Sequence, residues 1–489
     1  MSNQPNDVII GLEVHIQLTN LKTKLFCSCS NDYRGAEPNS HVCPICIGLP
    51  GTLPVVNKKA IEFATRLAIA LNCKINESMY FFRKNYFYPD MSKNFQISQY
   101  NKAGGKAFAD GGQINIKLNS HKKEIILNRI HLEEDPARLV HKGSIATSPY
   151  TLVDYNRSGV CLIEIVTEPV LSSPEEAREF LKQLKSIVQY SGISNLDYEG
   201  SVRVDANISI KGHERSEVKN INSFREVERA LRHEIIRQKN LLKRGKKLIQ
   251  ETRHWDDKRR ITITLRTKEF EADYRYFPEQ DLVHIEIDND FIQKVKDELP
   301  EMPRERSVRF RRDYNLSEFD SDNLVLDKDI ADFYEEGVNS DASFGSNEYK
   351  QYCNWLMNDI SRGLNEQNKT IKDTKLHPHQ IVDIIKYINK GKITTKIAKS
   401  IIDDMMDGYS ISEILEKKDK KRISDDILLK NFSNEVIEEN PNIVKDCREN
   451  PKAIEALIGR VMGKTRGQAD PHITRSIMLE LLKELGIIE

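Results

Sequence analysis

The chain lacks a net charge. Its 489 residues include 74 lysines and arginines and 74 aspartates and glutamates. A polycation as a whole is therefore excluded, and any nucleic acid would have to bind to local basic patches. At this length we expect about three domains, each large enough to bury a core of its own.

Long apolar segments are also missing. No stretch reaches the roughly 18 uninterrupted apolar residues that a membrane-spanning helix needs. The first residues, MSNQPNDVII, have neither the basic start nor the apolar core of a secretory signal. We therefore expect a cytoplasmic protein.

Several enzyme signatures are absent as well. The sequence contains no G-x-x-x-x-G-K-[ST] loop, no G-x-G-x-x-G turn after a strand and no nucleophile elbow. The run Gly104-Gly105-Lys106 is too short to count as a phosphate-binding loop. No serine-rich amidase loop is present, which argues against a glutaminase centre in this chain.

The first clear pattern that is present is the segment VIIGLEVHIQL, from Val8 to Leu18. Side chains of a strand alternate between two faces, so its even-numbered apolar residues share one face. Glu13 and His15 share the other, about 7 Å apart along the backbone. Such a pair can bind one divalent cation or one phosphate, although a solvated outer face of a sheet would also explain it.

Three later segments show the same alternation: CLIEIVTEP, SVRVDANISI and IILNRIHLEED. Their polar faces carry Glu164, Arg203, Asp205, Asn207, Arg129, His131 and Glu133. In the last segment, parity puts Glu134 opposite Glu133. Polar faces on four strands predict the floor of an open cradle, and oxygen-rich ligands with one imidazole suit magnesium or manganese.

Four of the eight cysteines cluster. Cys27 and Cys29 are followed by Cys43 and Cys46, so two close pairs flank a short loop. This spacing is typical of a tetrahedral zinc site, with redox chemistry or free thiols as alternatives. Four thiolates would fill the coordination sphere, so we expect a structural zinc in a knuckle at residues 27–46.

The segment RKNYFYPDM combines cations, amides and planar rings. Arg83 and Lys84 can bind phosphate, Asn85 is an amide donor, and Tyr88 is one of three neighbouring aromatic residues. This mixture suits a nucleotide or an RNA end. An aromatic loop packed on a sheet edge would explain it equally well.

Up to about residue 295, strand-like runs alternate with Gly, Pro and Asn. We expect helices at Lys58–Leu71, after Ser173 and at Phe224–Leu242. The sequence beyond Pro300 is helical in pattern, and its last part contains KKDKKR (Lys417–Arg422) and GKTRGQADP. The predicted domains are therefore 1–295, 296–408 and 409–489.

Long motifs in the sequence match a known family. IGLEVHIQL, GLPGTLPVVNKKA, RKNYFYPDM, HLEEDPARLVH, VDYNRSGVCLIEIVTEP, EVKNINSF, ADYRYFPEQDL and GKTRGQADP resemble the B subunit of the tRNA-dependent amidotransferases. The resemblance runs from about residue 8 to the C-terminus. It implies an α+β fold, in which a glutamine-synthetase-like antiparallel-sheet cradle domain precedes an all-α helical domain and a tRNA-binding tail.

The resemblance also implies chemistry and partners. Family members use ATP and magnesium to correct misacylated Asp-tRNA(Asn) or Glu-tRNA(Gln), in a heterotrimer with an amidase (glutaminase) partner and a small third subunit. By resemblance, Glu13, His15, Glu134 and Glu164 would bind magnesium, whereas parity favours Glu133 over Glu134, so both remain candidates. Lys464 and Arg466, together with the basic run Lys417–Arg422, are candidates for contacts with the tRNA backbone, although a solvated loop would explain the tail run equally well.

Two other functions fit parts of the sequence. One is a ligase that acts on a small amino acid, as glutamine synthetase does, but the long helical C-terminal third argues against it. The other is a non-catalytic, zinc-stabilised tRNA-binding scaffold. The acidic strand faces argue against that function, because carboxylates repel phosphate unless a metal intervenes.

Overall fold

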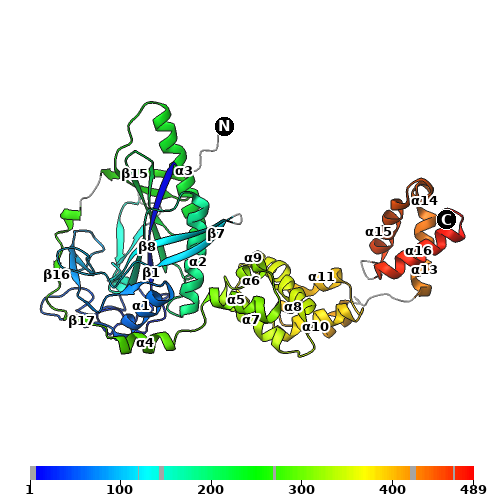
Figure 1. Ribbon diagram of the computed structural model, residues 1–489, viewed down its shortest axis with the longest axis horizontal. Coiled ribbons are helices and arrows are strands. Elements are labelled where there is room, and N and C mark those ends of the chain that lie inside the picture. The colour runs from blue at the N-terminus through cyan, green and yellow to red at the C-terminus, as the bar shows by residue number, and fades with distance from the viewer. Residues whose placement is uncertain are drawn as a thin grey trace. The chain divides into compact units, whose positions relative to one another are not determined.

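The computed structural model describes residues 7–118, 121–141, 148–267, 271–418, 426–465 and 469–488. The chain divides into two compact units, residues 1–303 and 304–489. The first unit combines a large sheet with helices, and the described part of the second is helical (Figure 1). Among the described residues, no helix is long and apolar enough to cross a membrane.

Ten of the described strands form one sheet, in which β1 (Val8–Gln17) lies between β11 (Cys161–Thr167) and β12 (Val202–Ile210). On the side of β12 the sheet continues through β13 (Ser216–Ile221), β14 (Glu251–Asp256) and β15 (Ile261–Thr267). On the side of β11 it continues through β8 (His121–Glu134), which pairs with β6 (Ala109–Asp110) and β7 (Gln113–Leu118), and ends at β2 (Lys74–Ile75).

The prediction of an antiparallel sheet is wrong at one place. Strands β13 and β14 pair in parallel, so the sheet is mixed. The reason is that α3 (Phe224–Lys243) connects them as a crossover helix, and a crossover returns the chain in the same direction. The pairs on both sides of β1 are antiparallel, as the sequence predicted.

Helices cover the apolar face of the sheet. α1 (Lys58–Ala70), α2 (Pro174–Ser191) and α3 contribute to one core with the even-numbered residues of β1 (Figure 1). Ser173 caps α2 by accepting a hydrogen bond from the backbone of Glu176, and Gly192 ends it with a φ of 69°. The predicted positions of these three helices are confirmed to within a residue.

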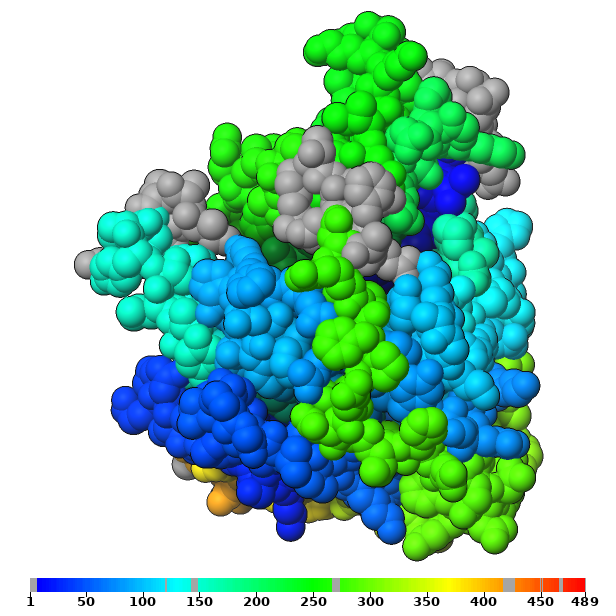
Figure 2. Space-filling view, turned by 90° about the vertical axis from the view of Figure 1, so that its left-hand side faces the viewer, coloured from blue at the N-terminus to red at the C-terminus, as the bar shows by residue number. Residues whose placement is uncertain are grey.

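Smaller sheets complete the first unit. β4 (Phe82–Asn85) lies between β5 (Phe95–Ser98) and β16 (Phe277–Pro278). Other pairs are β3 (Ser78–Met79) with β17 (Ile285–Glu286), and β9 (Arg138–His141) with β10 (Thr151–Asp154). Figure 2 shows the green segment with β16 and β17 crossing the blue surface of β3 and β4. The unit also contains α4 (Asn289–Asp297).

The second unit contains two separate hydrophobic clusters. The first extends from Phe310 to Leu415, and the second from Leu429 to Leu482. Helices of the first cluster are α5 (Pro303–Tyr314), α6 (Glu318–Leu324), α7 (Lys328–Asn339), α8 (Ser346–Asn354), α9 (Ser361–Gln367), α10 (Pro378–Asn389), α11 (Thr395–Met406) and α12 (Ile411–Lys418). Helices of the second cluster are α13 (Asp426–Glu439), α14 (Pro441–Glu449), α15 (Ile454–Lys464) and α16 (Pro471–Glu484).

Candidate functional site

Polar side chains form rows across the large sheet, because directly paired residues of neighbouring strands point to the same face. One row crosses β8, β11, β1 and β12 and consists of His131, Glu164, His15 and Arg203. Two residues further along, Glu13 of β1 lies beside Asp205 of β12. In the other direction, Glu133 follows His131 on the same face of β8.

The central row is closely packed. Nδ1 of His131 lies 3.0 Å from a carboxylate oxygen of Glu164, and Nε2 of His15 lies 3.8 Å from the other. Glu133 lies 3.6 Å from the same nitrogen of His15 and accepts a hydrogen bond of 2.9 Å from Ser98. The structure therefore brings His15, Glu133 and Glu164 together, and His131 contacts Glu164 from the neighbouring strand.

The face also gathers three carboxylates at its other end. The side-chain oxygens of Glu13, Asp205 and Glu217 lie within 4.8 Å of one another. Asn207 donates a hydrogen bond of 2.9 Å to Glu13, and Lys219 lies 3.1 Å from Glu217. Carboxylate oxygens at this separation suit a hard divalent cation such as magnesium.

The proximity of these acids changes their ionisation. Burial, with the charges of Glu164 and Asp205, raises the pKa of Glu13 to about 7. Burial and the charge of Glu164 raise the pKa of Glu133 to about 7 as well. Burial opposes the ionisation of Glu164, but its hydrogen bond with His131 and the charges of His131, His15 and Arg129 together lower its pKa. A cation would relieve the repulsion among these groups.

His15 remains neutral, because burial and the charge of Arg203 lower its pKa to about 4. A neutral imidazole can bind a metal or accept a proton. Four buried nitrogens on this face have no hydrogen-bond partner among the described residues: His15 Nδ1, His131 Nε2, Arg129 Nε and Arg203 Nε. Buried polar atoms are normally paired, so these four indicate a place for a ligand.

Glu134 does not join this group. Its carboxylate pairs with Lys93 and accepts a hydrogen bond of 2.9 Å from the backbone of Ile97. The alternation of β8 thus separates Glu134 from Glu133, as parity predicts.

The residues predicted to contact a nucleotide lie in different environments. Arg83 is held by Glu279 at 2.6 Å and by Asp281 at 3.1 Å. The charge of Lys84, the next residue of β4, acts to lower the pKa of both His15 and Glu133. Asn85 donates to the backbone of Arg275, and Tyr88 is 57% exposed. Of these four residues, Lys84 is the one whose charge influences the polar residues of the large sheet.

The four clustered cysteines come together as the spacing predicts. The sulfur atoms of Cys27, Cys29, Cys43 and Cys46 lie within 4.8 Å of one another. A hydrogen bond from Cys27 lowers the pKa of Cys46 to about 4, and burial raises the pKa of Cys29 to about 11. This cluster could hold a metal ion.

The tail residues are less distinctive. Lys464 pairs with Glu435 at 3.0 Å and Glu439 at 2.6 Å. Arg466 and the side chains of the basic run Lys417–Arg422 lie outside the described residues.

Comparison with known proteins places this geometry in a family. The sequence model of the "GatB/GatE catalytic domain" matches residues 8–293, which contain every polar row, and that of the "GatB domain" matches residues 332–482. The chain is 46% identical over 482 residues to the B subunit of an aspartyl/glutamyl-tRNA(Asn/Gln) amidotransferase from Sulfolobus acidocaldarius, covering 98% of this chain and 100% of that protein. It belongs to the family of amidotransferase B subunits.

Other relatives in this family cover the chain as fully. The amidotransferase B subunit of Thermotoga maritima is 45% identical over 485 residues, which cover 97% of this chain and 98% of that protein. The B subunit of Carboxydothermus hydrogenoformans is 43% identical over 488 residues, which cover 98% of this chain and 99% of that protein. The resemblance seen in the sequence is thus confirmed along nearly the whole chain.

Two site residues were not assigned a metal role from the sequence. Strand parity puts Asp205 on the polar face without a metal role, and none of the predicted sites includes Glu217. The alternation in EVKNI, where Glu217 and Lys219 share a face, is the signal that could have drawn attention to β13.

Proposed function

We propose that this chain is the amidating subunit of a heterotrimer that acts on misacylated Asp-tRNA(Asn), Glu-tRNA(Gln) or both. The observation that carries the proposal is the row of His131, Glu164, His15 and Arg203 within the region that matches the GatB/GatE catalytic domain. A charged row with unpartnered nitrogens supports binding of a charged substrate.

The reaction has two steps. An oxygen of the substrate's side-chain carboxylate attacks the γ-phosphorus of ATP, and ADP leaves with the electron pair of the broken P–O bond. The nitrogen lone pair of ammonia then attacks the acyl carbon, phosphate leaves, and the nitrogen loses a proton to give the amide. A partner amidase (glutaminase) supplies the ammonia, and a small third subunit completes the heterotrimer. Shielding from water is needed, because an exposed acyl phosphate would hydrolyse.

Two sets of ligands fit magnesium, which when bound would neutralise charge on the ATP phosphates. Glu13, Asp205 and Glu217 form one set of oxygen ligands. His15, Glu133 and Glu164 form the other set, in which His15 is neutral. In this set Glu133 replaces Glu134, the ligand that the family resemblance implies. The charge of Lys84 is available to orient a phosphate.

Zinc is the metal that best suits the four cysteines, because four thiolates form a closed tetrahedral set. The backbone carbonyl of Cys46 also accepts hydrogen bonds of 2.9 Å from Ser92 and Ser158, so the knuckle joins three segments. We expect one zinc per chain by elemental mass spectrometry, lost in Cys46→Ser and retained in Cys73→Ser. Equal zinc content in the two variants would contradict a zinc site here.

The test of the function uses the chain co-expressed with its amidase partner and the small third subunit. ATP, magnesium and ammonium chloride are supplied, so that the glutaminase is bypassed, and amide formation is measured on Asp-tRNA(Asn) and on Glu-tRNA(Gln) separately. We expect amidation of at least one, abolished by Glu164→Gln and unchanged by Glu199→Gln, whose side chain is 89% exposed. A wild-type complex that binds both tRNAs but amidates neither would instead support the scaffold function.

A further inference from the structure

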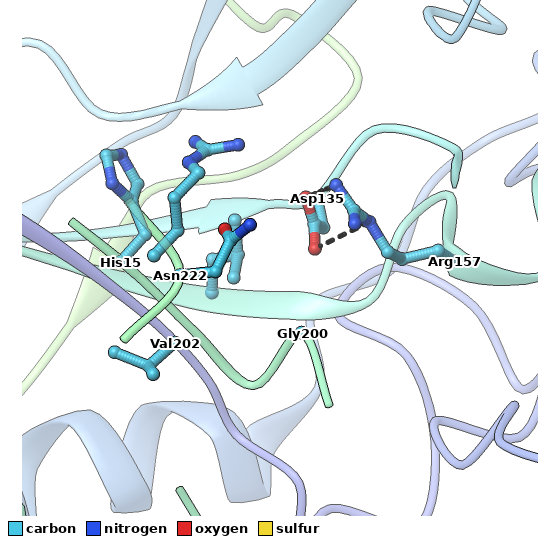
Figure 3. A pocket seen from close by; sticks show the side chains of 8 residues that line it. His15, Asp135, Arg157, Gly200, Val202 and Asn222 are labelled. Atoms are coloured by element: carbon cyan, nitrogen blue, oxygen red, sulfur yellow. Dashed lines mark hydrogen bonds and ion pairs between the residues drawn. The ribbon is translucent and has the colours of Figure 1, made fainter. Parts of the chain in front are cut away.

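A small cavity opens beside the polar rows, at the end where β1 finishes. It has a volume of about 50 Å³, and Arg203 is one of its lining residues. Figure 3 shows His15 and Asn222 on one side of it and Asp135 with Arg157 on the other. At roughly 10–15 Å³ for each water position, it has room for a few waters or for one carboxylate or phosphoryl group. It is too small for a nucleoside.

The two arginines in its wall differ in their partners. Arg157 lies 3.1 Å from one oxygen of Asp135 through Nε and donates to the other at 3.2 Å through a terminal nitrogen (Figure 3). Nε of Arg157 also donates to the carbonyl of Pro136 at 3.2 Å. The guanidinium of Arg157 is therefore occupied within the protein.

Arg203 has no such partner. It makes no hydrogen bond or ion pair with any residue that the structure describes, and its Nε is buried. Its neighbour on β1 is His15, which is neutral, and Asp205 lies two residues along its own strand. The charges of Asp205, Asp135 and Glu133 raise the pKa of Arg203, against the effect of burial. The side chain of Arg203 is half-buried, and its buried Nε lacks the hydrogen-bond partner that buried polar atoms normally have. Because this side chain lines a cavity, a ligand there could complete its hydrogen bonds.

The chemistry of the guanidinium defines that ligand. Its planar donors match the two oxygens of a carboxylate or of a phosphoryl group, and they give the strongest kind of charge-assisted hydrogen bond. Like charge disfavours an ammonium ion as the partner of this guanidinium. The cavity therefore selects a small oxyanion.

We propose that Arg203 binds the reacting oxyanion of the substrate, which is the side-chain carboxylate of the aminoacyl group or the phosphoryl group transferred to it. This inference rests on the proposed function, and adds to it a residue that recognises the acyl group rather than the tRNA. The row places Arg203 next to His15 and one strand further from Glu164, so the oxyanion would lie at the edge of the carboxylate cluster.

The test compares Arg203→Gln and Arg203→Lys with Arg178→Gln in the heterotrimeric complex. Arg178 lies on α2 in an exposed ion pair with Glu228 and serves as the matched control. The measured quantities are the affinity for aminoacylated and for deacylated tRNA, kcat and KM for amidation with ammonium, and the rate of ATP hydrolysis. Thermal unfolding of each complex verifies that it is folded.

We expect Arg203→Gln to lower kcat/KM by about tenfold to a hundredfold, from the loss of a charged hydrogen bond. Binding of deacylated tRNA should be unchanged. Arg203→Lys should recover part of the loss, because it restores the charge without the planar fork. If the carboxylate is the ligand, the preference for aminoacylated over deacylated tRNA disappears. If the phosphoryl group is the ligand, that preference remains and kcat for ATP hydrolysis falls.

Wild-type kinetics in both Arg203 variants, with a folded complex, would overturn this inference and leave the proposed function intact. Should the wild-type complex amidate no tRNA at all, the proposed function itself fails. If Arg203→Gln does not assemble, the comparison is made with Arg203→Lys, because that variant keeps the positive charge. An equal loss of affinity for both forms of tRNA would mean that Arg203 supports the tRNA site, which also contradicts the inference.

Discussion

The large sheet carries two networks of buried charge, and they differ in how completely they are paired. At the edge formed by β14 and β15, Glu234 is fully buried and accepts hydrogen bonds from Arg237, Gln238 and Thr262. Arg253 donates to Glu251 and to both Thr262 and Thr264. The polar rows around His15, by contrast, leave four ring or guanidinium nitrogens without a partner among the described residues.

We expect this difference to separate a structural network from a functional one. Burial and charge are common to both, so neither property identifies a site by itself. In the edge network the charged atoms satisfy one another, and the one unpartnered atom among these residues is the amide oxygen of Gln238. Unused hydrogen-bonding capacity is what the central rows have in addition, and a ligand is needed to complete it.

The strongest test of this comparison is Glu13→Gln. It removes a charge that Asp205, Glu217 and Glu164 repel, so the metal-free protein should be as stable as wild type or more so. Amide formation by the complex should fall by about a hundredfold to a thousandfold, the range seen when one group that stabilises transition-state charge is removed. Single-turnover amidation measures the activity, and urea unfolding measures the stability. If the variant loses activity because it is also less stable than wild type, Glu13 belongs to a structural network rather than a functional one.

Glu234→Gln should have the opposite profile. Removing one partner of a buried ion pair leaves Arg237 and Arg253 under-compensated, which costs about 3 kcal/mol of unfolding free energy. Amidation per folded complex should stay at the wild-type rate. Urea unfolding provides the measurement, with Glu199→Gln as the exposed control, which should change stability by less than about 1 kcal/mol. A normal unfolding midpoint in Glu234→Gln would show that the edge network is not structural.

One carboxyl of each network, Glu13 and Glu234, should respond to pH with opposite signs. The folded-state pKa of Glu13 is raised from 4.5 to about 7, so without magnesium its contribution to stability is lost as the pH rises through that window. Burial opposes the ionisation of Glu234, but hydrogen bonds from Arg237 and Gln238 and the charges of Arg237 and Arg253 together lower its pKa. Its contribution to stability is therefore lost as the pH falls below about 4.5.

If Glu13 is a magnesium ligand as proposed, the metal must displace the proton that Glu13 holds. Its affinity should therefore fall by up to about tenfold per pH unit below pH 7 for each proton displaced. Calorimetric titration at pH 6 and pH 8 measures this, and Glu13→Gln should flatten the dependence. If the magnesium affinity is the same at pH 6 and pH 8, the carboxyl groups with raised pKa values are not magnesium ligands.

The smallest effect is expected at an exposed pair in the tail. Lys464 is already engaged by Glu435 and Glu439, so Lys464→Ala should weaken tRNA binding by less than about threefold. Filter binding at two salt concentrations measures it. A larger loss, with a shallower salt dependence, would indicate that Lys464 leaves its partners to bind a phosphate.

Much of the central site was predictable from sequence, because strand parity is a local property. Parity alone put Glu13 beside His15, grouped Arg203 with Asp205, and favoured Glu133 over Glu134. Parity does not give the order of the strands in the sheet. The proximity of Glu13 on β1 to Glu217 on β13, with β12 between them, could therefore not be predicted.

Long-range pairing also escaped prediction at Arg83, whose carboxylate partner Glu279 is 196 residues away. The parallel pair of β13 and β14 escaped for a related reason. A helix between two strands permits either direction until the crossover is known.

The place of β1 at the middle of the rows has a consequence for how this protein can change. Glu13 and His15 reach the polar face because β1 is paired on both sides, to β11 and to β12. A deletion of one residue within β1 would shift its later side chains by one position, so that one stretch of the strand would turn its acids inward and its apolar residues outward. The strand can therefore tolerate a new residue at one position far better than a new length.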